Sequence, residues 1–173
     1  ITNNEESTIW NLCDYKAACY AGTEQGIAAT KSFTSQMLCL ILISLKLVEK
    51  IHGDNATIGY KKSLFSLPAV VDKALAKRED IKKLAAILAK ENTIVITADG
   101  ISYSLAKEAA LKIKETSYKN ISAAILGEFM HGHVAVLNNP SMLIYIAVNE
   151  ISKRSVSNLN KIKEDYKPKL VII

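Results

Sequence analysis

The chain has few of the residues on which small all-β folds depend. Aromatic residues make up 6% of its 173 residues, and it contains only seven glycines and three prolines. Turn-rich sandwiches and barrels are built from many short strands with Gly-rich and Pro-rich turns, so this composition argues against them. Alanine, leucine, isoleucine and lysine are frequent instead and favour helices. The length suits one globular domain, or pieces of two.

Cysteine is also scarce. Cys13, Cys19 and Cys39 are odd in number, lack the CxxC spacing and lie among apolar residues. This pattern argues against a disulfide framework and a zinc site, and it favours a reducing compartment such as the cytoplasm. We therefore expect buried, free thiols, and no metal.

No uninterrupted apolar run is long enough to cross a bilayer. The longest, Met37 to Leu45, is broken by Ser44 and falls far short of about 18 residues. The polar opening ITNNEES does not resemble a signal peptide. We expect no membrane partner and a cytoplasmic protein. The first residue is Ile1, and the last residues are strand-like, so the chain is expected to be truncated at both ends.

The formal net charge of +5 does not come from a basic patch. Lysines are spread along the chain and mixed with Glu and Asp in each helical stretch, without interleaved aromatics. Nucleic-acid-binding surfaces need clustered basic residues, so no nucleic-acid partner is expected. A small anionic substrate fits this charge equally well.

The first half of the chain is predicted to be mostly helical. Apolar residues recur on one helical face from about Thr30 to Ile51, and the middle of this segment is apolar nearly all round, which predicts burial on several sides. Residues 54–90 show no strand pattern, so we expect a helical connector. Shorter elements are expected before the long helix: a short helix or turn at Ser7–Leu12, a short strand at Asp14–Tyr20 and a loop at Gly22–Gly26.

From residue 92 the pattern changes to strands alternating with helices. Short β-branched or apolar runs, typical of buried parallel strands, are separated by helical segments and short loops. This order predicts an α/β fold with a doubly wound parallel sheet. The strands are expected at Thr93–Thr97, Ile121–Leu126, Met142–Val148 and Leu170–Ile173, with helices at Ser102–Tyr118 and Glu150–Tyr166 and a loop or single turn at Gly127–His133.

Three charged residues share one face of the first of these helices. Glu108, Lys112 and Glu115 stand at i, i+4 and i+7. A solvated face with a weak ion pair would explain them. However, the helix follows a strand of the predicted sheet, and open α/β folds bind ligands at the carboxyl edge of their strands.

Other candidate groups are weaker. His131 and His133 could be loop residues without a role, metal ligands with Glu128, or an acid/base group; the spacing argues against a metal. The chain has neither GxGxxG nor a Walker motif. Thr30 either caps the long helix or lies at a helix N-terminus that holds an anion.

Two motifs resemble the SIS (sugar isomerase) domain family. LAKEAALKIKETSYKNISAAILGEFMHGHVAVL is similar to the family pattern LExALKLKExSY followed by GE, two variable residues and HGP. Upstream, AGTEQGIAATKSFTSQ is similar to AGxExGVASTKxFTxQ. The likeness is greatest to the isomerase part of the phosphosugar aminotransferases and deglycases. It implies a flavodoxin-like SIS fold, divided into the end of a first SIS domain (1–53), a helical connector (54–90) and about two thirds of a second SIS domain (91–173).

The resemblance also implies roles for individual residues. Glu115 would move a proton between C1 and C2 of a sugar, and His131, supplied by the neighbouring subunit of a homodimer, would assist ring opening. Lys112 and Glu108 would position and polarise the site. The substrate-binding positions that the resemblance implies are Glu24, Ile27, Ala29 and Thr30. Two residues depart from the pattern: Ala29 replaces a common Ser, and His133 replaces the Pro after HG.

The implied function is a hexose-phosphate isomerase or aminotransferase of amino-sugar metabolism that needs no cofactor. Its substrate would be a phosphorylated sugar such as fructose 6-phosphate. A non-catalytic regulatory domain that binds a sugar phosphate is the alternative, and a purely structural role at a dimer interface is a third. The family's SxSGxTxxT phosphate loop and its C-terminal lysine are absent from this sequence, so the chain alone is expected to be inactive.

Overall fold

The computed structural model describes residues 1–137 and 140–173, which form two compact units. The N-terminal unit covers Ile1–Arg78 and the C-terminal unit covers Glu79–Ile173. The three-part division expected from the sequence stays a prediction.

The N-terminal unit consists of helices and an irregular opening segment. Its long helix α2 begins at Lys31 and ends at Gly53, whose φ of 83° suits a glycine at a helix end. The expected strand at Asp14–Tyr20 is wrong: only one parallel bridge forms, between Thr2 and Ala18. The helices of this unit are α1 (Thr8–Leu12), α2 (Lys31–His52), the 3₁₀ helix η1 (Asp54–Thr57), α3 (Ile58–Phe65) and α4 (Leu67–Leu75).

Helix α2 keeps its apolar side chains largely exposed. Leu40, Leu42 and Leu47 are about half exposed, and Glu49 is the helix's one buried residue, so the expected burial on several sides is not seen. By length and composition alone, α2 could cross a membrane. The apolar run Met37–Leu45, which is only nine residues long, does not suggest this. A core helix of a soluble protein passes the same test, so this is weak evidence.

Buried Glu49 joins the end of α2 to the elements that follow. Its carboxylate lies 3.0 Å from Lys46 Nζ, and it also contacts Lys61 Nζ and the Thr57 hydroxyl. The hydrogen bond from Lys61 is the main reason that the pKa of Glu49 falls to about 2. The chain reversal from α2 into α3 is therefore held by an ion-pair network.

The thiols are free, but they are not all buried as expected. Cys13 is exposed, while Cys19 and Cys39 are half-buried. Desolvation, together with neighbouring Cys39, raises the pKa of Cys19.

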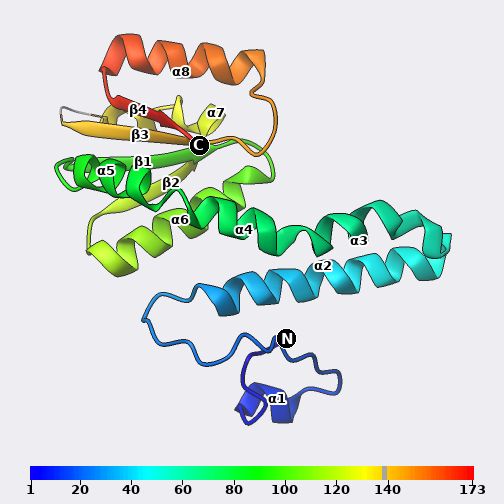
Figure 1. Ribbon diagram of the computed structural model, residues 1–173. Coiled ribbons are helices and arrows are strands. Elements are labelled where there is room, and N and C mark those ends of the chain that lie inside the picture. The colour runs from blue at the N-terminus through cyan, green and yellow to red at the C-terminus, as the bar shows by residue number, and fades with distance from the viewer. Residues whose placement is uncertain (138–139) are drawn as a thin grey trace. The chain divides into compact units, whose positions relative to one another are not determined.

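The C-terminal unit is a parallel four-stranded sheet with helices on both faces (Figure 1). The strand order is β2-β1-β3-β4, and all three pairings are parallel, which confirms the predicted doubly wound α/β fold. The strands are β1 (Thr93–Ala98), β2 (Ile121–Ile125), β3 (Ser141–Ile146) and β4 (Lys169–Ile172). The helices are α5 (Arg78–Leu88), α6 (Ser102–Ser117), α7 (Leu126–Phe129), the 3₁₀ helix η2 (His133–Val136) and α8 (Lys153–Tyr166).

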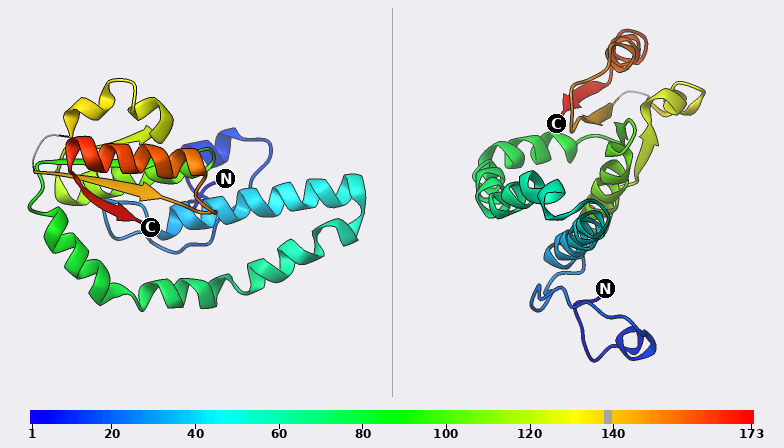
Figure 2. Two further views of the ribbon diagram at one scale, coloured as in Figure 1. Left: turned by 90° about the horizontal axis from the view of Figure 1, so that it is seen from above. Right: turned by 90° about the vertical axis from the view of Figure 1, so that its right-hand side faces the viewer.

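The alternation of side chains along β1 divides the core into two layers. Ile94 and Ile96 pack with Ala106 and Ala110 of α6 on one face, where α5 also lies. Val95 packs on the other face, with residues of α7 and α8 such as Phe129 and Leu159. Figure 2 shows the same layers from two further directions. This packing fixes α6 with its first residues at the carboxyl edge of the sheet.

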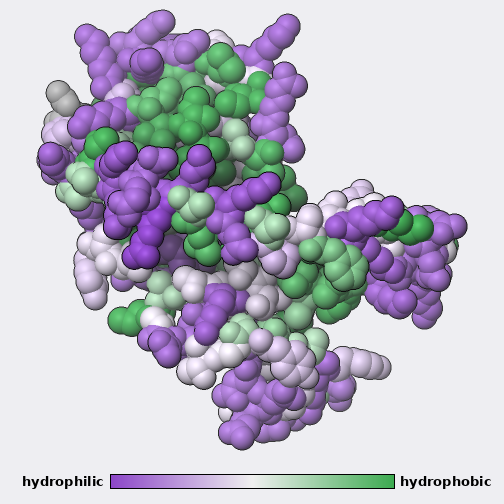
Figure 3. Space-filling model, viewed as in Figure 1, coloured by the Kyte–Doolittle hydropathy of each residue, from purple (hydrophilic) through white to green (hydrophobic). Residues whose placement is uncertain are grey.

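The edge strand β4 borders an apolar surface. Ile172 is 52% exposed and Ile173 is 63% exposed. In Figure 3 hydrophobic residues gather beside this strand, beneath α8.

Candidate functional site

The charged face predicted on α6 is present. The helix is 16 residues long, and its small residues Ala106 and Ala110 face the sheet. Glu108, Lys112 and Glu115 therefore lie on a different face, and their side chains are only 24–29% exposed. The structure thus brings together three of the four predicted catalytic residues.

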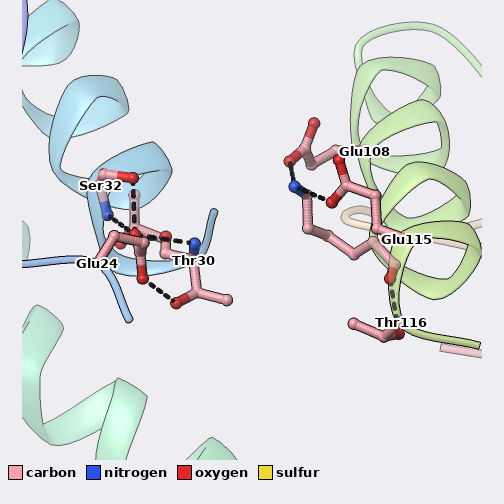
Figure 4. A network of polar contacts seen from close by, with 8 residues as sticks. Glu24, Thr30, Ser32, Glu108, Glu115 and Thr116 are labelled. Atoms are coloured by element: carbon pink, nitrogen blue, oxygen red, sulfur yellow. Dashed lines mark hydrogen bonds and ion pairs between the residues drawn. The ribbon is translucent and has the colours of Figure 1, made fainter. Parts of the chain in front are cut away.

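Lys112 is the centre of this group; Figure 4 labels the two carboxylates that it pairs with, Glu108 and Glu115. Lys112 Nζ lies 2.7 Å from Oε2 of Glu115 and 3.5 Å from Oε1 of Glu108. The hydrogen bond to Glu115 is the main reason that the pKa of Lys112 is raised, so the amine stays protonated. One ammonium group holds two carboxylates in place, and the shorter bond favours Glu115. We call Glu108, Lys112 and Glu115 the α6 triad.

The three charged side chains of the α6 triad are less exposed than they would be on a fully solvated helix face. A helix surface residue usually extends into water, and its ion pairs contribute little to stability. Here all three charged groups lose about three quarters of their accessible surface. Half-buried, paired charges on one helix are better suited to binding and proton transfer than to solubility.

His131, the fourth predicted catalytic residue, lies apart from the α6 triad in the turn between α7 and η2. Its backbone N–H donates to the carbonyl of Glu128 at 3.0 Å, and the residue is exposed. Gly132 follows with a φ of 103°, a conformation that glycine adopts readily. No described side chain bonds the imidazole. His133 differs: with Tyr103 and Glu128 it lines a groove of about 470 Å³ along β2.

In the N-terminal unit, Glu24 binds the start of α2 (Figure 4). Its carboxylate accepts hydrogen bonds from the backbone N–H and hydroxyl of both Thr30 and Ser32, at 2.7–3.2 Å. The hydroxyl of Ser32 is the main reason that the pKa of Glu24 falls to about 2. Thr30 is the N-cap residue but makes no side-chain cap bond, because its hydroxyl donates to Glu24.

The loop between Glu24 and Thr30 holds the other two predicted substrate-binding positions. Ile27 is 88% exposed, and Ala29 is half-buried. An isoleucine so exposed makes little contribution to the core. The bonds of Glu24 and Thr30 go to the protein itself, so their direct role is to shape this loop, and contact with a substrate stays a prediction.

Sequence reasoning missed a polar cluster at the carboxyl edge of the sheet. Asp99 follows β1, and its Oδ2 accepts hydrogen bonds from Tyr145 Oη at 3.0 Å and Ser155 Oγ at 2.7 Å. Burial raises the pKa of Tyr145, so its hydroxyl stays a donor. The only signal in the sequence was an Asp-Gly pair directly after a buried strand.

Residues 1–137 and 140–173 contain no group of three or more His, Cys, Asp or Glu side chains that could hold a metal ion. The α6 triad consists of two glutamates and one lysine, and a lysine ammonium is not a metal ligand.

Comparison with known proteins decides the family. The family model described as SIS domain matches residues 87–173, which include the α6 triad and both histidines of the α7–η2 turn. The chain belongs to the SIS domain family. The resemblance stated from its motifs is thereby confirmed.

Curated relatives extend the match into the N-terminal unit. A protein from Wigglesworthia glossinidia brevipalpis named glutamine–fructose-6-phosphate aminotransferase (isomerizing) is 29% identical over 166 residues, which cover 94% of this chain and 27% of that protein. A protein of the same name from Buchnera aphidicola is 33% identical over 151 residues, covering 87% and 25%. The chain thus spans about a quarter of the length of these relatives.

Solved structures show the same fold. The C-terminal domain of glucosamine-fructose-6-phosphate aminotransferase from Francisella tularensis superposes with a TM-score of 0.90 at 26% identity, covering 98% of this chain and 49% of that one. A glucosamine-6-phosphate deaminase from Thermotoga maritima has a TM-score of 0.74 at 21% identity, covering 99% of this chain and 50% of that one, a likeness that shows the fold alone. The family and the fold are those of sugar-phosphate enzymes.

Proposed function

We propose that this chain carries the proton-transfer part of a phosphosugar isomerase or aminotransferase that acts on a hexose phosphate in amino-sugar metabolism. The α6 triad is the observation that carries the proposal. Its two carboxylates and one ammonium are half-buried, fixed by short contacts, and lie within the segment that matches the SIS family.

Glu115 is the proposed acid/base residue. Interconversion of an aldose and a ketose needs one group that takes a proton from one carbon and returns it to the neighbouring carbon. A carboxylate can do both in turn when it is held in position. The 2.7 Å contact with Lys112 fixes Glu115 while leaving its Oε1 without a bond to any other described side chain.

Lys112 is proposed to stabilise the oxyanion of the enediol-like intermediate. Its pKa is raised, so it provides a full positive charge. A preorganised cation next to developing negative charge lowers the barrier because no solvent has to reorganise. Glu108, at 3.5 Å, holds Lys112 from its other side.

His131 is proposed to act on the ring oxygen of a sugar bound to the neighbouring subunit of a homodimer. Its exposure, and the lack of a bond from its imidazole to any side chain within residues 1–137 and 140–173, support this role. The loop from Glu24 to Thr30, with Ile27 and Ala29, is proposed to contact the sugar. No cofactor is required, because proton transfer needs none.

A soluble, cytoplasmic location is proposed together with this function. The named relatives are metabolic enzymes, and the Francisella tularensis structure aligns with nearly the whole chain, which supports α2 as a helix packed within such an enzyme.

The test is Glu115→Gln in the whole natural polypeptide that contains this sequence. Gln keeps the size of the side chain but cannot take up a proton. We expect isomerisation of fructose 6-phosphate to fall by about 10²–10⁴-fold while its dissociation constant changes little. Glu164→Gln, at an exposed position on α8, is the matched control. Binding without turnover in the unmodified protein would favour the regulatory alternative, and unchanged turnover in Glu115→Gln would exclude the catalytic assignment.

A further inference from the structure

A cavity of about 260 Å³ lies at the carboxyl edge of the sheet, between the loop after β1 and the loop after β3. These strands are neighbours, but the chain goes from β1 to β2 on one side and from β3 to β4 on the other. Open α/β sheets bind ligands at such a switch point. The cavity is formed by the C-terminal unit alone and includes no residue of the α6 triad.

One carboxylate oxygen of Asp99 accepts hydrogen bonds from the protein, and the other is available to a ligand. Tyr145 and Ser155, which are 4% and 6% exposed, both donate to Oδ2. Oδ1 accepts no hydrogen bond from any residue within 1–137 and 140–173. Because its donors are buried and rigid, the carboxylate presents Oδ1 in a fixed orientation.

Ser102 is a second and independent sign of a ligand. It lines the cavity and is only 7% exposed, yet its hydroxyl bonds to none of the described residues. Its Oγ is not among the buried side-chain atoms without a partner, which in the described residues are Glu91 Oε2 and Ser141 Oγ, so it is accessible from the cavity. A hydroxyl of a bound molecule in the cavity could bond to it in place of solvent, since a hydroxyl group both donates and accepts.

The charge of the cavity selects the kind of ligand. Two helices, α6 and α8, begin at this edge, and each N-terminus acts as about +0.5 of an elementary charge. The carboxylate of Asp99 offsets both, and Glu150, which also lines the cavity, adds negative charge. The groups that line the cavity therefore offer a phosphate no net positive charge; Lys153 and Arg154, in the first turn of α8, are exposed and are not part of the lining.

We propose that this cavity binds the hydroxyl groups of a small neutral polyol and excludes phosphate. A ligand hydroxyl donates to Asp99 Oδ1, and another bonds Ser102. The volume, just under the roughly 300 Å³ of typical ligand pockets, suits a small molecule. The proposal does not depend on the chemistry of the α6 triad.

The test is an NMR titration of the chain with sorbitol and, separately, with inorganic phosphate. We expect sorbitol to shift the amide signals of Gly100 and Ser102 saturably, and phosphate to leave them unchanged. Asp99→Asn keeps the shape but removes the charge, so sorbitol affinity falls about tenfold and phosphate now binds. Asp165→Asn, on the exposed side of α8, keeps the wild-type response.

Ser102→Ala is a second test variant, which tests the proposal even if Asp99→Asn fails to fold. The hydroxyl that it removes makes no hydrogen bond within the described chain, so the fold is retained while sorbitol affinity falls severalfold. Three results would overturn the proposal: no saturable shift with sorbitol in the wild type, an unchanged affinity for sorbitol in both variants, or phosphate binding as tightly to the wild type as to Asp99→Asn.

Discussion

Glu24 accepts two hydrogen bonds from Ser32, from the backbone nitrogen at 3.0 Å and from Oγ at 2.7 Å. Glu24, seven positions before the first residue of α2, thus replaces the N-cap side chain, because the side chain of Thr30 makes no cap bond. The negative charge also lies at the positive end of the helix, where it is favourable.

The Glu24 cap predicts a loss of stability in acid. Bonding to Ser32 and Thr30 lowers the pKa of Glu24 from 4.5 to about 2 in the folded chain. The stabilisation is therefore complete above pH 4.5 and is lost as the pH falls toward 2. Glu24→Gln should flatten this part of the profile, measured as the thermal midpoint at pH 2–5. An unchanged profile would mean that the cap does not form.

The Glu49 network predicts a separate effect at the other end of α2. Lys61→Met removes the largest cause of the low pKa of Glu49 and leaves a buried carboxylate with fewer partners. We expect the thermal midpoint to fall by several degrees at pH 7 and by less near pH 2, where Glu49, with its pKa of about 2, is already half protonated in the folded wild type. Lys62→Met, one residue along α3, is the control, and an equal loss in both variants would argue against the network.

Thiol labelling should follow burial. Cys13 is exposed, whereas Cys19 is half-buried and its pKa is raised by desolvation. A raised pKa leaves less thiolate, the reactive form, at pH 8. Mass spectrometry after brief alkylation should find Cys13 modified before Cys19. Labelling of Cys19 first would contradict the described surroundings of these thiols.

A shared site predicts complementation between inactive variants. If His131 acts across the subunit boundary, His131→Ala and Glu115→Gln proteins mixed under subunit exchange should recover up to about a quarter of the wild-type turnover, since one site in four of the random mixture is intact. Each variant alone stays inactive. If a mixture that is shown to exchange subunits recovers no turnover, His131 and Glu115 act within one chain.

Much of the C-terminal unit could be predicted because its signals are local. The β-branched run at Thr93–Thr97 predicts a buried strand, and the spacing of Glu108, Lys112 and Glu115 predicts a shared helical face. The segment Asp14–Tyr20, predicted as a strand, has no β-branched residue, and without a neighbouring strand it forms one bridge with Thr2 and no ladder. Strand formation depends on a partner that composition does not reveal.

The polar networks could not be predicted because their partners are distant in sequence. Asp99 bonds Tyr145 and Ser155, which are 46 and 56 residues away. Glu49 bonds across the reversal between α2 and α3. Each residue alone is an ordinary acidic residue in the sequence, and only the fold shows which oxygen is held and which is available.

The central claim is that Glu115 transfers the proton, and solvent exchange tests it most directly. The whole natural polypeptide is incubated with fructose 6-phosphate in D₂O, and deuterium at C1 is measured by NMR. We predict incorporation in the wild type and in Glu164→Gln, and a loss of about 10²-fold or more in Glu115→Gln. Exchange at the wild-type rate in Glu115→Gln would contradict the account.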